Sequence, residues 1–286
     1  MRSSTTSLPA ADQQSFEALA AEMTGIGRLG VAFSGGVDSA VLLAAAARAL
    51  GPDHVLALLG VSASLASHER DIARDLATDI GVELLEFDPG ETDLPAYRVN
   101  ALDRCYHCKS ALFRTIDDSV VRQHHLDAVA YGENADDSLA PDRPGGRAAT
   151  EHRILRPLAE AGLTKVRVRS LARALGLSVA DKPAAPCLAS RIPHGQEVTP
   201  LKLRQVEDAE SVVRAQGFSD CRVRHHGDIA RIELPAAELA RLADEDLRHR
   251  MLTGVREAGF THVTVDLAGI QSGLFSLSLL REGLHA

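Results

Sequence analysis

The chain has 286 residues, which is long enough for one large domain or two of ordinary size. Hydrophobic residues make up 45% of it, charged residues 24%, and the formal net charge is −8; this is the composition of a globular protein and argues against a strongly basic, nucleic-acid-binding surface. The longest apolar run, at 40–47, is too short to span a membrane, and no signal peptide is recognisable, so we expect a cytoplasmic protein with no membrane or nucleic-acid partner.

The first half of the chain alternates between apolar runs and helical segments. Residues 1–12 are expected to be disordered and 13–25 helical. Strands are predicted at 29–33, 55–60, 83–87 and 127–131, separated by helices at 38–50, 66–80 and 107–124. Continuously apolar strands separated by helices are typical of a parallel sheet covered on both faces, which binds its ligands at the carboxyl ends of the strands.

The second half departs from this alternation. We expect a flexible loop at 141–147, a helix at 164–175 and a short last strand at 177–180. Beyond residue 193, the pattern predicts a helix at 200–216, strands at 221–225 and 229–234, a helix at 236–257, a strand at 261–267 and a final helix at 271–281. The sequence therefore predicts an α/β protein with two domains, a parallel-sheet domain of residues 1–190 and a smaller α+β domain of residues 191–286.

A glycine-rich turn, SGGVDS at 34–39, lies where the first predicted strand meets the next helix. Glycines at such a junction allow backbone N–H groups and the positive end of the helix to face one anion. The turn is too short for a Walker A loop and lacks the three spaced glycines of a dinucleotide-binding fingerprint. We interpret it as a phosphate site, in preference to an ordinary tight turn capped by Asp38 or Ser39.

Three of the four cysteines stand where they can carry chemistry. Cys105 and Cys108 form a CxxC motif at the start of a predicted helix, which suits a thiolate, a zinc knuckle or an iron–sulfur site. Cys187 lies between prolines in the loop after the last predicted sheet strand, with Lys182 and Arg191 close enough in sequence to favour its thiolate. Cys221 is expected to be a core thiol.

Five segments resemble, in this order, the LarE-type sulfur transferases of the PP-loop superfamily: SGGVDSA at 34–40, RCYHCK at 104–109, YGENADD at 131–137, LRPLAEAGLTKVRVRSLARALGL at 155–177 and DKPAAPCLASRIPHG at 181–195. Those enzymes make the nickel-pincer nucleotide cofactor of lactate racemase. The resemblance runs from residue 11 to 270. It implies a HUP-like PP-loop ATP pyrophosphatase domain, a substrate-binding and oligomerisation domain, and a homo-oligomer, by resemblance a hexamer.

The resemblance also implies a reaction. ATP, with Mg²⁺, would adenylylate a carboxylate of pyridinium-3,5-biscarboxylic acid mononucleotide; pyrophosphate would leave, and sulfur would then displace AMP. The candidate catalytic residues are Cys187, Asp38 and Lys109. The candidate ligands of ATP are Ser34, Gly35, Gly36, Asp38, Ser39, Gly60, Ser62, Gly132, Arg156 and Lys165. Mg²⁺ would be held by Asp38 with Asp136 or Asp137.

The smaller domain is expected to bind the rest of the substrate. Arg222 and Arg224 alternate along a strand, so both lie on one face and form a candidate clamp for the substrate phosphate. An exposed polar strand face is the plain alternative. The resemblance adds Glu210 and Glu233 as metal ligands. For Arg167 and Arg169 we expect a solvated helix face.

Sulfur has two sources in the family. In single-cysteine enzymes the thiol at the position of Cys187 gives up its sulfur and becomes dehydroalanine; in three-cysteine enzymes a 4Fe-4S cluster carries an extra sulfide. Cys105, Cys108 and Cys187 match the three-cysteine pattern, so we favour the cluster and keep the sacrificial route as the alternative. A PP-loop tRNA thiolase would need a basic surface and stacking aromatics, whereas this chain has 3% aromatics and no Trp. A non-catalytic nucleotide-binding module leaves Cys187 unexplained.

Overall fold

The computed structural model describes residues 8–139 and 144–270. Contacts between residues divide the chain into two compact units. The first unit comprises Met1–Ser62, Ser67–Glu91 and Cys105–Ala185; the second comprises Ala63–Ala66, Thr92–Arg104 and Pro186–Ala286. The domain boundary at 190/191 stays a prediction. Among the helices described, none is both long and apolar enough to cross a membrane.

The first unit is built on a parallel sheet of four strands in the order β3-β2-β1-β4. The strands are β1 (Leu29–Ala32), β2 (Val55–Gly60), β3 (Glu83–Phe87) and β4 (Ala128–Tyr131). Leu29 of β1 pairs with Val55 on one side and with Ala128 on the other. The predicted α/β class is confirmed. The strand order reverses between β1 and β4, and ligands of such sheets bind beyond the strand ends at this reversal.

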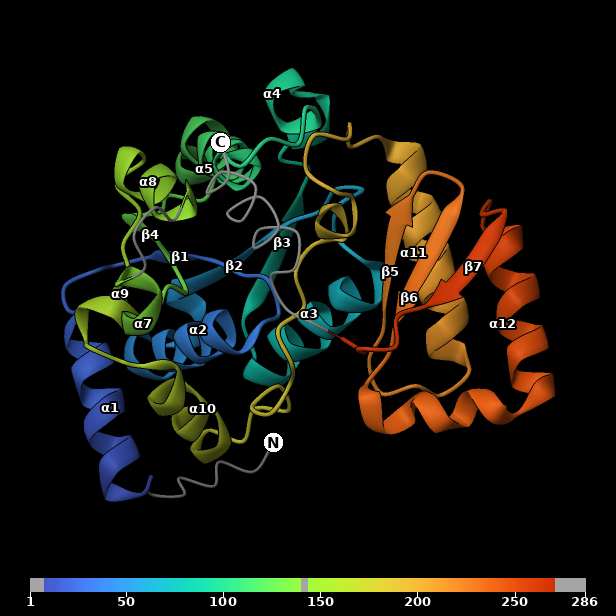
Figure 1. Cartoon of the computed structure of the whole chain (residues 1–286). Coiled ribbons are helices and arrows are strands. Elements are labelled where there is room, and N and C mark those ends of the chain that lie inside the picture. The colour runs from blue at the N-terminus through green and yellow to red at the C-terminus, as the bar shows by residue number, and fades with distance from the viewer. Residues whose placement is uncertain (1–7, 140–143, 271–286) are drawn as a thin grey trace. The chain divides into compact units, whose positions relative to one another are not determined.

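Helices cover both faces of this sheet (Figure 1). They are α1 (Ala10–Ala21), α2 (Val37–Leu50), α3 (Ser67–Ile80), α5 (Arg104–Thr115), α6 (Val121–Gln123), α7 (Ala135–Ser138), α8 (Pro144–Glu151), α9 (Pro157–Glu160) and α10 (Lys165–Ala174). On one face, α2 contacts β1 and β2 and α3 contacts β3, while α1 and α10 pack against α2. On the other, Phe113 and Ile116 pack against Leu58 and Val129. Both faces of β1, β2 and β4 are therefore largely buried, as their apolar sequences require, whereas the edge strand β3 is only partly covered.

Several predicted elements of this unit are wrong. The first helix begins at Ala10, so the part of the expected disordered tail that is described, residues 8–12, already includes its first turn. Of the loop expected at 141–147, residues 141–143 lie outside the described residues, and the rest is the start of α8. The helix expected at 107–124 begins at Arg104 and contains a π-helical turn, Ile116–Val120.

The strand predicted at 177–180 is absent from the structure, which forms turns over these described residues. Ala180 N–H donates to the Leu177 carbonyl and Lys182 N–H to the Val179 carbonyl. Arg169 binds the carbonyls of Ala180 and Lys182, which a strand would offer to a neighbouring strand. The expectation that Arg169 is merely solvated is therefore wrong, whereas Arg167 is exposed as expected.

The second unit contains a three-stranded sheet with helices on one face (Figure 1). Its elements are α4 (Pro95–Arg98), the 3-10 turn Leu188–Arg191, α11 (Pro200–Ala215), β5 (Arg222–His226), β6 (Ile229–Glu233), the 3-10 segment Ala236–Ala243, α12 (Glu245–Glu257) and β7 (His262–Val265). β5 is antiparallel to β6, and β7 is parallel to it. The core packs Val213, Met251 and Val255 against Val223 and Ile232.

The helix predicted at 236–257 is interrupted. Asp244 has an extended backbone, and its side chain accepts a hydrogen bond from Leu247 N–H at 3.0 Å, so it caps a new helix instead of continuing the old one. The final helix predicted at 271–281 lies outside the described residues.

Candidate active site

The turn at 34–39 joins the end of β1 to the start of α2. Gly35 has φ +69°, in the left-handed region that favours glycine. The Ser39 hydroxyl accepts from Ser34 N–H at 3.2 Å and donates to the Gly36 carbonyl at 3.0 Å, so the two serines hold the turn from within. The first turn of a helix has N–H groups without intrahelical partners. The turn therefore has the shape and dipole of an anion site.

Gly132 brings the end of β4 against this turn. A Cβ built on Gly132 would lie 2.7 Å from the backbone nitrogen of Ser39 and 2.9 Å from the Asp38 carbonyl carbon. Both are backbone atoms, which cannot move aside as a flexible side chain can. A glycine is therefore needed here, and it places the segment after β4 beside the phosphate turn.

Asp38 lies at the centre of a group of polar side chains. The Lys165 ammonium is 2.5 Å from its carboxylate, and the Asn134 amide lies 3.4 Å from its other oxygen. The same amide donates to the Asp137 carboxylate at 2.8 Å, while the Asp136 carboxylate accepts from the Lys165 backbone N–H at 2.7 Å. Asn134 thus links Asp38 to Asp137, and Asp136 is directed to the start of α10.

The other predicted ligands of ATP in this unit, and the catalytic candidate Lys109, lie near neighbouring strand ends. Lys109 Nζ is 4.2 Å from the centre of the Tyr131 ring, and Arg156 is 3.8 Å from the carboxylate of Glu133, two residues after β4. A Cβ on Gly60, the last residue of β2, would lie 2.8 Å from Leu112. Ser62 donates to the buried carboxylate of Glu91. The positive charges of Lys109 and Arg156 are therefore both held beside the end of β4.

The cysteines fall into both units. Cys105 is exposed and Cys108 half-buried in α5; since they are three residues apart on a helix, they share one face. Cys187 is exposed and precedes the 3-10 turn of the second unit. No three described His, Cys, Asp or Glu side chains are gathered as a metal site. Cys221 is buried, and burial, assisted by the Glu210 carboxylate, raises the pKa of its thiol to about 12, as suits a core thiol.

Arg222 and Arg224 are only 5% and 4% exposed, which excludes the exposed strand face. Arg224 forms a bidentate pair with Glu233, both contacts 2.9 Å. Burial, together with the charges of Arg191 and Arg224, lowers the pKa of Arg222. The two arginines share the face opposite Val223, which packs in the core. This face of β5 therefore carries two buried guanidiniums, of which that of Arg224 is already paired with a carboxylate.

Glu210 and Glu233 are fully buried and bind arginines in this structure. Glu210 accepts from Arg191 at 2.7 Å, from Arg214 at 3.2 Å and from Val223 N–H at 3.0 Å. Burial alone would lower the pKa of Arg191, but the adjacent Glu210 raises it. The two carboxylates therefore serve as anchors for cations of this chain.

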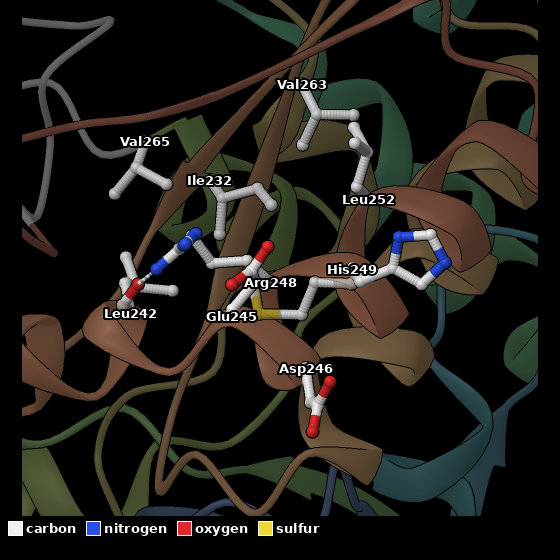
Figure 2. Close-up of a pocket in the computed structure, with 10 residues that line it drawn as sticks. Ile232, Leu242, Glu245, Asp246, Arg248, His249, Leu252, Val263 and Val265 are labelled. Atoms are coloured by element: carbon white, nitrogen blue, oxygen red, sulfur yellow. Dashed lines mark hydrogen bonds between the residues drawn. The ribbon is translucent and has the colours of Figure 1, made fainter.

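A hollow of about 560 Å³ lies elsewhere in the second unit, between α12 and strands β6 and β7 (Figure 2). Ile232, Val263 and Val265 line it from the strands, and Glu245 and Arg248 from α12. None of the predicted site residues lines it, so the chemistry expected of those residues does not take place in this hollow.

Several polar residues that contact the predicted site residues or their neighbours in the structure were missed by the sequence analysis. Asn134 and Glu133 lie inside the YGENADD segment, of which Gly132 and the later carboxylates are predicted ligands. Arg104 lies inside RCYHCK, where the cysteines carry the stronger signal. Asn100, fully buried with φ +59°, carries no sequence signal of its own. Asn134, Glu133 and Arg104 could have been found by considering every polar residue of the matching segments as a candidate.

Comparisons with known proteins agree with this geometry. The family described as asparagine synthase matches residues 14–234. An uncharacterized protein of Synechocystis sp. is 39% identical over 85% of this chain and 90% of its own length, and an uncharacterized protein of Methanocaldococcus jannaschii is 29% identical over 59% and 64%. The pyridinium-3,5-bisthiocarboxylic acid mononucleotide synthase of Lactiplantibacillus plantarum is 34% identical over 93% of this chain and 95% of its own length. With that extent of similarity and the glycine-rich turn in place, the chain belongs to the LarE-type family of PP-loop enzymes, which use ATP.

Proposed function

We propose that this enzyme adenylylates a carboxylate of pyridinium-3,5-biscarboxylic acid mononucleotide and replaces one of its oxygens with sulfur, giving a thiocarboxylate. The observation that carries the proposal is the near full-length similarity to a pyridinium-3,5-bisthiocarboxylic acid mononucleotide synthase, combined with a glycine-rich turn whose Asp38 pairs with Lys165. Since the relative's name describes a product with two thiocarboxylates, the same chemistry on the same ring is the simplest assignment for this chain.

In the first step, a carboxylate oxygen of the substrate attacks the α-phosphorus of ATP. A new P–O bond forms, the bond to the bridging oxygen breaks, and pyrophosphate leaves with its electron pair. The backbone of residues 34–39 would hold the phosphates, with Gly60, Ser62 and Gly132 lining the nucleotide. Lys165, Arg156 and Lys109 would offset the negative charge that develops on the departing pyrophosphate.

The residues around Asp38 fit a magnesium ion. Asp38 and Asp137 both present carboxylate oxygens and are joined through the Asn134 amide, and oxygen ligands are what Mg²⁺ prefers. Asp137 is therefore the better second ligand than Asp136, whose carboxylate binds the Lys165 backbone. A bound Mg²⁺ would neutralise phosphate charge during the transfer.

In the second step, sulfur attacks the acyl carbon and AMP leaves. If the Cys187 thiolate is the nucleophile, a thioester forms; loss of the Cα proton and cleavage of the Cβ–S bond then leave the thiocarboxylate and dehydroalanine at 187. We favour the other route, in which Cys105, Cys108 and Cys187 hold a 4Fe-4S cluster. Their three thiols suit iron, and two of them share one face of α5. A bound cluster would supply the sulfide.

The second unit would hold the phosphate of the substrate. Arg222 and Arg224 present their guanidiniums on one buried face, where an added anion is attracted more strongly than in water. Glu210 and Glu233 remain proposed metal ligands, although each would have to exchange its arginine partners for the ion.

The test of the function is pyrophosphate release from ATP, with and without the pyridinium mononucleotide, on protein purified without oxygen. We expect release that depends on the mononucleotide, and a product heavier by the replacement of oxygen with sulfur. Release that is equal without the mononucleotide, or with a tRNA in its place, would contradict the assignment.

The two sulfur sources are separated by the number of turnovers with added sulfide and by the mass of the peptide that contains Cys187. More than one sulfur transferred per chain with Cys187 intact supports the cluster. So does the loss of this repeated transfer in each of Cys105→Ser, Cys108→Ser and Cys187→Ser, provided that Cys221→Ser retains it. A single transfer, with the Cys187 peptide lighter by H₂S, would establish the sacrificial route instead.

A further inference from the structure

The backbone that carries Cys187 is held by arginine side chains. Arg191 Nη1 donates to the Pro186 carbonyl at 2.6 Å and lies 3.4 Å from the Cys187 carbonyl. Arg104 donates to the Ala189 carbonyl and Arg224 to the Ser190 carbonyl, both at 3.0 Å. Four of five consecutive carbonyls, those of 186, 187, 189 and 190, are thus bound by three guanidiniums.

These guanidiniums are themselves buried and fixed. The arginines at 104, 191 and 224 are only 4–6% exposed. Glu210 binds Arg191 and Glu233 binds Arg224, each through both carboxylate oxygens, and Asn100 accepts from Arg104. A planar guanidinium held on one edge by a carboxylate presents its remaining N–H groups in fixed directions, which a lysine ammonium cannot do.

Backbone bonds complete the segment. Leu188 N–H donates to the Ser64 carbonyl at 2.9 Å, and Ser190 N–H to the Cys187 carbonyl at 2.9 Å. Cys187 nevertheless remains exposed while the next two residues, Leu188 and Ala189, are fully buried. An exposed sulfur therefore sits on a backbone with little freedom, whereas an ordinary loop cysteine would sit on a mobile one.

We propose that Arg104, Arg191 and Arg224 are positioning residues that hold Cys187 in the orientation needed for sulfur transfer. The inference rests on the proposed role of Cys187, and it assigns to Arg224 a second task beside phosphate binding. Positioning of this kind acts on the transfer step in both routes, since Cys187 is either the nucleophile or a ligand of the cluster that supplies the sulfide. A misplacement of about 1 Å at such a site costs on the order of a hundredfold in rate. Adenylylation of the substrate does not involve Cys187 and is left intact.

The test compares Arg191→Lys with Arg214→Lys in the full-length protein. Arg214 binds the same Glu210 carboxylate but none of the carbonyls near Cys187, so it is a matched control for the loss of that ion pair. Amide hydrogen exchange of the peptide containing Leu188, Ser190 and Ile192 is measured first. We expect exchange to be about tenfold faster in Arg191→Lys and unchanged in Arg214→Lys, since about one hydrogen bond is lost.

Kinetics then separate positioning from a general loss of structure. In Arg191→Lys, single-turnover formation of thiocarboxylate should slow by about tenfold to a hundredfold, while pyrophosphate release and the KM for ATP change by less than about twofold. A proportional loss of both steps, or wild-type exchange at 188–192, would overturn the proposal.

Arg104→Lys provides a second variant should Arg191→Lys fail to fold, and the same exchange and kinetic pattern is expected of it. Failure of the proposed function is distinguishable from failure of this inference. A wild-type protein that makes no thiocarboxylate contradicts the function, whereas hydrogen exchange at 188–192 still decides whether the arginines hold the segment.

Discussion

The two units build their binding surfaces in opposite ways. In the first, the phosphate turn consists of backbone, glycines and serines, and the nearby charges are partly open to water: the side chains of Asp38 and Lys165 are 20% and 39% exposed. In the second, the charges are buried pairs of arginine and glutamate, such as Arg224 with Glu233, at 5% and 0%. A surface of the first kind is completed by its ligand, whereas in one of the second kind the charges already have partners within the chain before a ligand binds.

The largest effect on pyrophosphate release is expected from removing the carboxylate of Asp38. Asp38→Ala should slow pyrophosphate release by about a hundredfold to a thousandfold, as is typical when one preorganised electrostatic group is removed, without altering the fold. Asp137→Ala should also slow pyrophosphate release, because Asn134 joins the two carboxylates. Asp136→Ala is the control, and an equal loss in Asp136→Ala would contradict the assignment of Asp137. Pyrophosphate release and circular dichroism are the measurements.

The contrast between the units also explains what the sequence could predict. The parallel sheet, the turn at 34–39 and the buried Cys221 follow from local patterns: apolar runs separated by helices, and two glycines at a strand end. The arginine contacts around Cys187 join residues up to 85 positions apart in the chain, as in the hydrogen bond from Arg104 to Ala189. No spacing rule links residues that far apart.

Two incorrectly predicted elements, the strand at 177–180 and the helix at 236–257, have one physical cause. Residues 177–180 read as a strand because they are short and apolar, but their carbonyls are taken by Arg169 from the preceding helix and by the turns themselves. The long helix expected over 236–257 breaks because the Asp244 side chain binds Leu247 N–H. In both places a side chain competes for backbone groups that regular structure would use.

A second prediction concerns the buried arginine–glutamate pairs of the second unit. Glu210→Ala removes a fully buried carboxylate and leaves the Arg191 guanidinium, 7% exposed, without its ion partner. Breaking a buried pair in this way should cost about 3 kcal/mol in the free energy of unfolding. The exposed pair of Arg173 and Asp181 offers the comparison: Asp181→Asn should leave denaturant unfolding unchanged. Equal behaviour of the two variants would show that burial does not govern these pairs.

A third prediction concerns the backbone of the phosphate turn. Gly132→Ala forces a Cβ to 2.7 Å from the Ser39 nitrogen, so the end of β4 must shift away from α2. Overpacking of this kind costs about 1–3 kcal/mol, and ATP-dependent pyrophosphate release should fall with it. Gly146→Ala is the control, since its Cβ would lie at an ordinary 3.5 Å from Glu133. A Gly132→Ala protein with unchanged stability would mean that the approach of β4 to α2 is not tight.

The smallest effect is expected from a surface cluster of the first unit, and it tests whether exposed charges can approach the strength of buried ones. Hydrogen bonds from Arg70 and then from Arg74 lower the pKa of Glu86 from 4.5 to about 2. A carboxyl whose pKa is lower in the folded than in the unfolded state stabilises the fold above the unfolded pKa and loses this contribution as pH falls toward the folded pKa. The free energy of unfolding of the wild-type protein should therefore exceed that of Glu86→Gln at pH 6 by about 1 kcal/mol or less, and the difference should shrink between pH 4.5 and 2.

Urea unfolding of both proteins at several pH values measures this difference in free energy. Glu17→Gln, on the exposed side of α1, is the control for losing one surface charge. A difference that grows as pH falls would reverse the sign and exclude the cluster as a stabilising element. A difference near 3 kcal/mol at pH 6 would remove the contrast between the two kinds of charge pair, because two arginines on one half-buried carboxylate would then equal a fully buried pair.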